Sequence, residues 1–209
     1  MGGDLYDFFP LDENRVCFMI GDVSDKGVPA ALFMAMVRTA FRISATAGGD
    51  SAASTLRTVN RFLYENNESQ MFVTMFTCIL DRRTGLVEYS DGGHEPPFVL
   101  RAGGAIEMLE KKSGIALGFL DDYEFPEGTI QLGPGDSLLL YTDGVNEAMN
   151  FQRDLFKTTG IQTALLPVSS RVPAETVTLN LMRELSLFVG GAPQSDDITV
   201  MVVRYCGRQ

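Results

Sequence analysis

One stretch constrains the fold more than any other, because an apolar run, an acidic turn and an apolar helix follow one another directly. The run Val16–Ile20 has the composition of a buried strand, and the turn Gly21–Gly27 comes next. Pro29 suits the first turn of a helix, which we predict from about residue 29 to residue 44. Asp22 therefore lies where a buried strand ends, a rigid position from which a carboxylate can hold a hard cation.

Similar acidic turns recur at Asp4, Asp143 and Asp196. If neighbouring strands bring these residues to the same end of the fold, four or five carboxylates converge, and they need cations to stay ionised together. Oxygen ligands without clustered His or Cys favour Mg²⁺ or Mn²⁺, and two such ions can activate a water and bind a phosphoryl oxygen. An aspartate in a turn is also explained by hydrogen bonds to its own backbone, and the pattern alone leaves both interpretations open.

Composition excludes several classes of function. The 209 residues suffice for one sizeable core, and the net charge of -10 argues against a nucleic-acid partner. No uninterrupted apolar run reaches the ~18 residues of a membrane span, so we expect no membrane segment in this fragment. The three cysteines, Cys17, Cys78 and Cys206, are too far apart for a metal site and indicate reduced thiols in the cytoplasm.

Hairpins dominate the predicted secondary structure. Strand-like runs at 5–9 and 15–20 flank a turn, and further strands follow between residues 71 and 141, with an edge strand at 124–132 and a last strand at 198–205. Few helices separate the strands, which favours antiparallel sheets over βαβ units. The first expected helix, at 29–44, is apolar almost all round, so we predict that it is buried on more than one side. A second helix follows, capped by Asp50 or Ser51. Short helical stretches are expected around Glu147 and Leu155, and an amphipathic helix at 173–189 that ends before Gly190.

Six motifs occur in order along nearly the whole chain: Gly2–Asp7, Gly21–Leu32, Met71–Thr74, Gly92–Pro97, Leu140–Ala148 and Asp196–Thr199. Together they resemble the metal-dependent protein phosphatases (PPM, the type-2C phosphatases), in the bacterial SpoIIE/RsbU-like branch. The resemblance implies an α+β fold of two packed antiparallel β-sheets flanked by helix pairs, an αββα sandwich. It also implies a helix and a strand before Gly2, so residues 1–209 are expected to be a single phosphatase domain truncated at its N-terminus.

The resemblance further implies a site with two divalent cations, Mn²⁺ or Mg²⁺, that hydrolyses phosphoserine or phosphothreonine through a metal-activated water. Asp22 would bridge both metals, and the backbone carbonyl of Val23 would ligate one of them. Asp143 and Asp196 would bind the other metal, and Asp4 would help to hold the second, directly or through water. Residues that would lie close behind these ligands or near the phosphate are Ser24, Lys26, Thr142, Asn146 and Asp197.

Some positions depart from the family pattern or have simpler explanations. Ser24 stands where eukaryotic relatives carry a His that is a candidate general acid, so water would have to protonate the leaving group. Asp25 stands where many members of this branch have Gly. Helix capping explains Thr142 and Asn146 as well as a role at the site does, and Lys26 is equally explained as a solvated lysine at a helix start. For His94, a structural role in a Pro-rich loop is favoured over a catalytic one.

Two functions follow from the resemblance. The first is the phosphatase output domain of a bacterial signalling protein, which acts in the cytoplasm on a phosphorylated anti-sigma-factor antagonist of the STAS type. The resemblance also allows a homodimer and a full-length protein anchored to the membrane through regions outside this fragment. The alternative is a weak or inactive binding module in partner switching. A nucleotide cyclase is excluded because Gly2-Gly3-Asp4 lacks a βαβ context, and a haloacid-dehalogenase-type phosphatase because no Asp-x-Asp motif follows an early strand.

Overall fold

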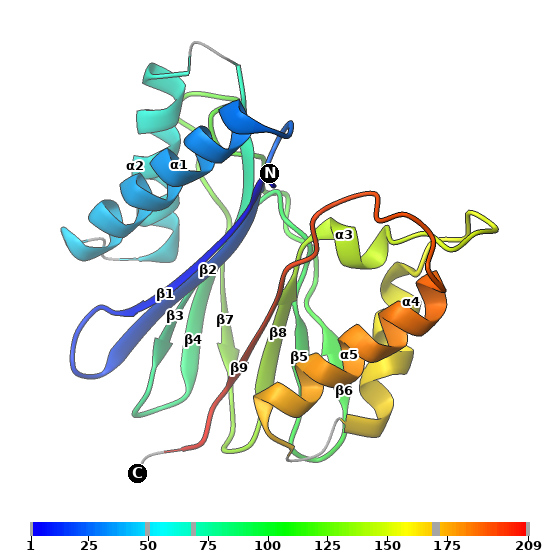
Figure 1. Ribbon diagram of the computed structural model, residues 1–209. Coiled ribbons are helices and arrows are strands. Elements are labelled where there is room, and N and C mark those ends of the chain that lie inside the picture. Colours follow the sequence, from blue (N-terminus) through cyan, green and yellow to red (C-terminus); the bar gives the residue numbers. More distant parts are fainter. Residues whose placement is uncertain (1, 49–50, 68–69, 169–171, 208–209) are drawn as a thin grey trace. The chain divides into compact units, whose positions relative to one another are not determined.

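The computed structural model describes residues 2–48, 51–67, 70–168 and 172–207 (Figure 1). The chain forms two compact units. Unit 1 is Met1–His94 with Lys111–Gln131, and unit 2 is Glu95–Glu110 with Leu132–Gln209. Each unit has its own antiparallel sheet, as the many hairpins in the sequence predicted, and each has its own hydrophobic core.

Unit 1 is built on a five-stranded sheet in the order β1-β2-β3-β4-β7. Its strands are β1 Asp4–Pro10, β2 Arg15–Val23, β3 Val73–Asp81, β4 Leu86–Gly92 and β7 Glu127–Gln131. The strands β1 to β4 pair with their neighbours in sequence, and β7 adds to the free side of β4. The predicted first hairpin and the predicted edge strand are therefore both confirmed.

Two helices, α1 Val28–Thr46 and α2 Ala52–Glu65, cover one face of this sheet (Figure 1). Ser51 caps α2, because its side chain accepts a hydrogen bond from Ser54 N–H while the Ser54 side chain accepts one from Ser51 N–H. Asp50, the other predicted cap, lies outside the described residues. The core between helices and sheet includes Phe9, Met19, Phe33, Phe41, Leu56, Val59 and Met75.

Helix α1 is buried along one stripe only, so the prediction of burial on more than one side is wrong. The stripe is Ala30, Phe33, Val37, Phe41 and Ala45, at helical spacing. Leu32 and Ile43 on the other faces are 68% and 62% exposed. The helix is an outer layer of unit 1, and apolar composition alone does not determine which residues are buried.

The same helix is long and apolar enough to meet a length-and-composition test for a membrane span. Its only charged residues, Arg38 and Arg42, both bind the buried carboxylate of Asp7 on β1. Arg42 makes two hydrogen bonds to Asp7, at 2.8 and 3.0 Å, and its guanidinium lies 4.7 Å from the centre of the Phe9 ring. These contacts tie α1 to the sheet of unit 1.

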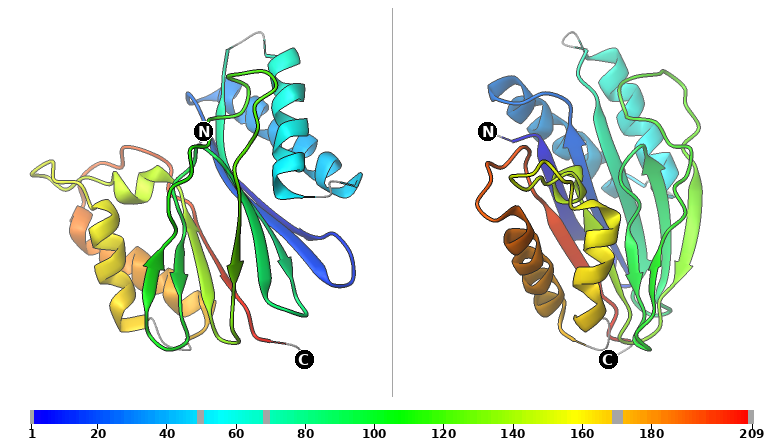
Figure 2. Two further views of the ribbon diagram at one scale, coloured as in Figure 1. Left: turned by 180° about the vertical axis from the view of Figure 1, so that it is seen from behind. Right: turned by 90° about the vertical axis from the view of Figure 1, so that its right-hand side faces the viewer.

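Unit 2 is built on a four-stranded sheet in the order β6-β5-β8-β9. Its strands are β5 Phe98–Leu100, β6 Ile106–Met108, β8 Ser137–Tyr141 and β9 Val200–Arg204. The helices are α3 Asp143–Asn146, α4 Lys157–Leu165 and α5 Ala174–Val189, with a 3-10 turn at Leu166–Val168. Figure 2 shows α4 and α5 side by side on one face of this sheet, where Ile161, Leu181 and Leu185 form part of the core.

The short helical stretches predicted around Glu147 and Leu155 correspond to α3 and α4. Glu147 is the C-cap residue of α3, and Leu155 lies in a bridge with Met149 just before α4. Between them, Asn150 Oδ1 accepts hydrogen bonds from the backbone N–H groups of Gln152 and Asp154, which closes a tight loop and prevents a continuous helix. The predicted end of α5 is confirmed, with Gly190 in the left-handed region at a φ of 59°.

Candidate functional site

In unit 1, sheet register brings Asp4 and Asp22 together. The two residues are directly opposite each other in the β1–β2 ladder. Side chains directly opposite in an antiparallel pair project from the same face, with Cβ atoms about 4.5–5.5 Å apart. The ladder continues one step further, where Val23 N–H donates a hydrogen bond of 3.2 Å to the carbonyl of Gly3. Two of the predicted metal ligands are therefore neighbours because of backbone pairing alone.

Gly3 makes this approach possible. A Cβ on residue 3 would lie 2.6 Å from the carbonyl oxygen of Val23 and 2.9 Å from Asp22 Oδ1. Both distances are shorter than real Cβ contacts allow, so a larger residue would displace two of the predicted metal-ligand groups. The motif Gly2–Asp4 was recognised in the sequence, but the role of Gly3 as a close backbone neighbour of Asp22 was not.

The turn after β2 explains two departures from the family pattern. Ser24 is tied to Phe72, since its backbone N–H donates to the Phe72 carbonyl and its Oγ accepts from Phe72 N–H, at 2.9 and 3.0 Å. Asp25 has a φ of 71°, in the left-handed region that glycine occupies without strain. A backbone of this kind favours the Gly that the resemblance leads one to expect at this position. Lys26 lies exposed beside it, just before α1.

A hydrogen-bonded pair that sequence reasoning missed supports Asp22 from β3. Thr74 Oγ1 donates to the backbone carbonyl of Asp22 at 3.4 Å and lies 2.9 Å from His94 Nδ1. Because a hydroxyl has one proton, His94 Nδ1–H donates to Thr74 when Thr74 donates to Asp22. His94 is 3% exposed, and its backbone N–H donates to Asp91 Oδ1 at 3.0 Å. This buried histidine fixes its loop, in line with the structural role predicted for it.

In unit 2, hydrogen bonds of one threonine, rather than strand register, hold together the segments that carry Asp143 and Asp196. Asp143 is the first residue of α3, directly after β8, while Asp196 lies in the loop before β9. Thr142 joins the two segments, because its N–H donates to the Thr199 carbonyl at 3.1 Å and its Oγ1 accepts from Thr199 N–H at 3.0 Å. Thr142 occupies the N-cap position of α3, but among the described residues its side chain makes no cap hydrogen bond, so the capping explanation for it is wrong.

Gly144 sets how closely the two segments pack. A Cβ on residue 144 would lie 1.8 Å from the carbonyl oxygen of Asp197 and 3.4 Å from the Cβ of Asp196. The loop is fixed on its other side, where Gln194 Nε2 donates to the Asp196 carbonyl at 2.6 Å. Asp196 Oδ1 accepts the backbone N–H of Asp197 at 2.8 Å. Asp143, Asp196 and Asp197 are each half-buried, and the close approach of Gly144 to Asp197 brings their backbone segments together.

The donor set fits a hard cation in its chemistry. Every predicted ligand is a carboxylate or carbonyl oxygen, which Mg²⁺ and Mn²⁺ prefer. Asn146 Oδ1, one helical turn after Asp143, is buried and accepts no hydrogen bond from the described residues, so it can accept one from a cation-bound water. Among the described residues, no group of three or more His, Cys, Asp or Glu side chains forms a metal site. Metal binding by Asp4, Asp22, Val23, Asp143 and Asp196 stays a prediction.

Cys17 and Cys78 are unsuited to act as nucleophiles. Burial, together with the nearby charge of Asp7, raises the pKa of the Cys17 thiol to about 12. Burial also raises the pKa of Cys78 well above its ordinary value. Both thiols are therefore protonated and unreactive at neutral pH, which confirms the interpretation of Cys17 as a core residue.

The family model for Stage II sporulation protein E (SpoIIE) matches residues 12–205. The chain belongs to the SpoIIE family. Protein IcfG of Synechocystis sp. is 30% identical to this SpoIIE-family chain over 230 residues, covering 97% of the chain and 36% of that protein. Phosphoserine phosphatase RsbU of Bacillus subtilis is 34% identical over 148 residues, covering 70% of the chain and 43% of RsbU. The SpoIIE-family chain thus spans about two fifths of the length of these relatives.

Solved structures confirm the predicted α+β fold. The RsbU and RsbW domains of Rv1364c from Mycobacterium tuberculosis match this SpoIIE-family chain with a TM-score of 0.84 and 28% identity, over 100% of the chain and 57% of theirs. The SiaA-PP2C domain of Pseudomonas aeruginosa matches with a TM-score of 0.84 and 22% identity, over 98% and 81%. The resemblance to type-2C phosphatases, written PP2C in these names, is therefore confirmed at the level of family and fold.

Proposed function

We propose that this SpoIIE-family chain is a metal-dependent phosphatase domain that hydrolyses phosphoserine or phosphothreonine on a protein. Two observations support the proposal: strand register sets Asp4 opposite Asp22, and the segments that carry Asp143 and Asp196 lie close together. Holding like charges together costs free energy unless cations bind to them. A scaffold that has no use for cations gains nothing from this arrangement. Both pairs are required for activity in the proposed function.

Each pair has a defined part in the proposal. Asp22, with the carbonyl of Val23, and Asp4 hold divalent cations from unit 1, and Asp143 and Asp196 hold them from unit 2. Mg²⁺ or Mn²⁺ held by these residues would lower the pKa of water and would neutralise the oxygens of the phosphoryl group. RsbX, a neighbour with a TM-score of 0.70 and 15% identity, has been solved in complex with magnesium, which supports the choice of cation.

Residues beside the ligands orient the reaction. Thr142 and Thr74 fix the two pairs through the hydrogen bonds described above, and Asn146 offers its buried oxygen as an acceptor for water. Lys26, exposed in the turn after β2, would contact the substrate phosphate in this proposal. Ser24 is bound to Phe72 and is not a general acid, so water protonates the leaving group.

The proposed substrate is a phosphorylated anti-sigma-factor antagonist of the STAS type, in the cytoplasm. Support comes from the names of relatives, since RsbU and RsbP of Bacillus subtilis are phosphoserine phosphatases. Removal of the phosphate would change which partner that small protein binds, so the chain would act as the output domain of a signalling protein, as a monomer or as a homodimer. The two units together would serve as one catalytic domain.

The proposal is tested by hydrolysis of p-nitrophenyl phosphate by residues 1–209 with Mn²⁺, with Mg²⁺ and with excess EDTA. We expect turnover with either metal, none with EDTA, and loss of turnover in both Asp22→Asn and Asp143→Asn. Turnover that persists in EDTA contradicts a metal-dependent reaction. Absence of turnover with every metal contradicts the phosphatase and favours the alternative, a binding module in partner switching.

A further inference from the structure

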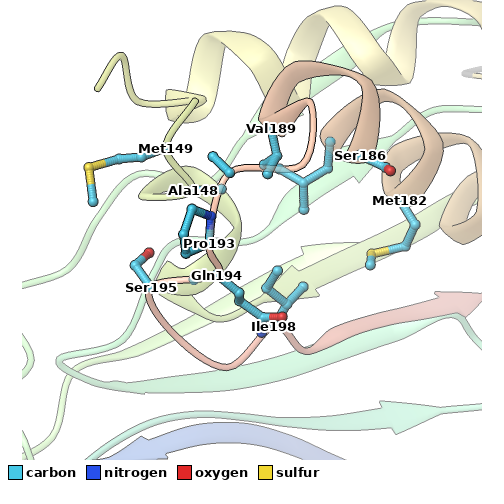
Figure 3. A pocket seen from close by; sticks show the side chains of 12 residues that line it. Ala148, Met149, Met182, Ser186, Val189, Pro193, Gln194, Ser195 and Ile198 are labelled. Atoms are coloured by element: carbon cyan, nitrogen blue, oxygen red, sulfur yellow. The ribbon is translucent and has the colours of Figure 1, made fainter. Parts of the chain in front are cut away.

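A cavity of about 240 Å³ lies within unit 2, on the side of α3 where the loop before β9 passes (Figure 3). Its walls are the C-terminal half of α5, the loop 192–198 and the segment 144–149. Figure 3 shows Met182 and Val189 on one side of the cavity and Pro193 and Gln194 on the other. The cavity is smaller than the about 300–1,000 Å³ of a typical small-molecule site, so it fits a single side chain better than a cofactor.

The lining is apolar and carries no charge among the described residues that form it. Met182, Leu185, Val189, Pro193 and Ile198 supply most of the surface, and Ser186 and Gln194 add polar groups. Met182 is 37% exposed, so the cavity opens to solvent beside it. An apolar recess that is open to water gains free energy when an apolar group fills it.

The cavity shares backbone with the candidate metal residues. Gly144 and Ser195 line it, and they are the direct chain neighbours of Asp143 and Asp196. Gln194, which also lines it, donates its side-chain hydrogen bond to the carbonyl of Asp196. Because neighbouring Cα atoms are about 3.8 Å apart, a group bound in the cavity lies within a few residues' reach of a phosphate bound through cations at these aspartates.

We propose that this cavity binds one apolar side chain of the phosphoprotein substrate, within about three residues of the phosphoserine. The inference rests on the proposed function and adds a determinant of substrate choice to it. The chain carries a net charge of -10 and a phosphoserine carries about -1.5 to -2, so long-range electrostatics oppose binding. Burial of an apolar side chain beside the phosphate supplies the affinity that the overall charge does not.

The experiment uses nine-residue peptides with a central phosphoserine in an alanine and serine background. Leucine replaces alanine at each of the three positions on either side, and kcat/KM is measured with Mn²⁺ by phosphate release. We expect leucine at one position to raise kcat/KM about tenfold over the all-alanine peptide, the lower end of what an apolar pocket discriminates. The variant Met182→Lys should abolish this preference, and the conservative Met182→Leu should keep it.

Leu187→Lys is the matched control, because Leu187 is 69% exposed on the same helix and does not line the cavity. It should retain the leucine preference, and thermal unfolding of all three variants shows whether they fold. A leucine preference that survives Met182→Lys, or equal turnover of every peptide by the unmodified protein, overturns the cavity as a substrate pocket while the phosphatase stands. Failure to hydrolyse both the peptides and p-nitrophenyl phosphate overturns the proposed function and the pocket with it.

Discussion

The two units hold their aspartates by different means. In unit 1, Asp4 and Asp22 are neighbours because β1 and β2 pair in register, so the backbone ladder places them. In unit 2, Asp143 follows a strand while Asp196 lies in a loop, and side-chain bonds from Thr142 and Gln194 hold that loop. Many backbone hydrogen bonds hold a pair of strands together, whereas only a few side-chain hydrogen bonds hold the loop. We therefore expect the site residues of unit 2 to be more sensitive to changes in their surroundings than those of unit 1.

This difference also bears on regulation of the proposed activity. Loops open locally at lower free energy than paired strands do. Asp196 can therefore be displaced at a smaller cost than Asp22, and a partner that moves the loop before β9 would act on unit 2 first.

The largest effect is expected from the aspartates themselves. Asp22→Asn and Asp143→Asn each remove the charge of a proposed ligand while keeping the size of the side chain. Each should lower metal-dependent kcat by at least about 100-fold. This is the upper end of the effect of losing a residue that only supports a ligand. Steady-state hydrolysis of p-nitrophenyl phosphate with Mn²⁺ measures this. If either variant keeps full turnover, the pair in that unit is not part of the site.

The next effect is expected at the two glycines that permit close approach. Gly144→Ala would place a Cβ 1.8 Å from the Asp197 carbonyl, and Gly3→Ala would place one 2.6 Å from the Val23 carbonyl. Both should lose activity, and Gly144→Ala should also lower the free energy of unfolding by about 1–3 kcal/mol through overpacking. Urea unfolding and kcat measure the two effects. Gly103→Ala is the control, since a Cβ there meets open space.

A smaller effect is expected at Thr74, which acts on Asp22 only through its carbonyl. Thr74→Val removes the bonds to Asp22 and His94 and should lower kcat about tenfold, as for other residues that support a ligand. Thr77→Val is a matched control on the same strand, because the Thr77 hydroxyl is buried without a hydrogen-bond partner among the described residues. Equal kcat in the two variants would show that the Thr74 hydroxyl does not position Asp22.

The smallest effect on activity, with a distinct effect on stability, is expected at Asp7. Burial by itself raises the pKa of this carboxyl, but hydrogen bonds and charges from Arg38 and Arg42 outweigh it and hold the pKa below its ordinary value. The stability that Asp7 contributes is therefore present above about pH 4, the unfolded pKa, and is lost as pH falls through the lower folded pKa. Asp7→Asn should cost roughly 1.5–3 kcal/mol at pH 7.

Urea unfolding at pH 7 and below pH 4 checks this prediction for unit 1. The cost of Asp7→Asn should shrink as pH falls, while kcat at pH 7 stays close to that of the unmodified protein. Glu65→Gln, which breaks the exposed pair with Arg61, is the control and should change stability very little at either pH. A cost of Asp7→Asn that is the same at both pH values would contradict the assigned role of the carboxylate.

Much of the fold could be predicted because it depends on local patterns. The hairpin of residues 5–20, the strand 137–141 and the helix ending at Gly190 each follow from alternation, apolar runs and turn residues that lie next to one another in sequence. The aspartates of the candidate site were found for the same reason, since each lies at an end of a strand or just outside one. Sequence therefore locates the pieces of the site well.

The remaining features depend on contacts between distant segments. The closeness of Gly144 to Asp197 and the bond from Thr74 to Asp22 join residues about 50 positions apart, and neither residue has a local pattern that reveals its partner. Helix α1 was misjudged for a related reason, because Leu32 and Phe33 look alike in sequence and only packing decides which of them is buried. The positive φ of Asp25 could be anticipated, because the family pattern has Gly at this position and Gly adopts such a backbone without strain.

The central claim is that the candidate aspartates of each unit are needed to bind the functional cations. Isothermal titration of Mn²⁺ into the metal-free protein, compared with Asp22→Asn and Asp143→Asn, tests it most directly. The account predicts that each variant alone weakens Mn²⁺ binding at least tenfold, while thermal unfolding in EDTA shows both variants folded. Mn²⁺ binding that is unchanged in either folded variant would contradict it.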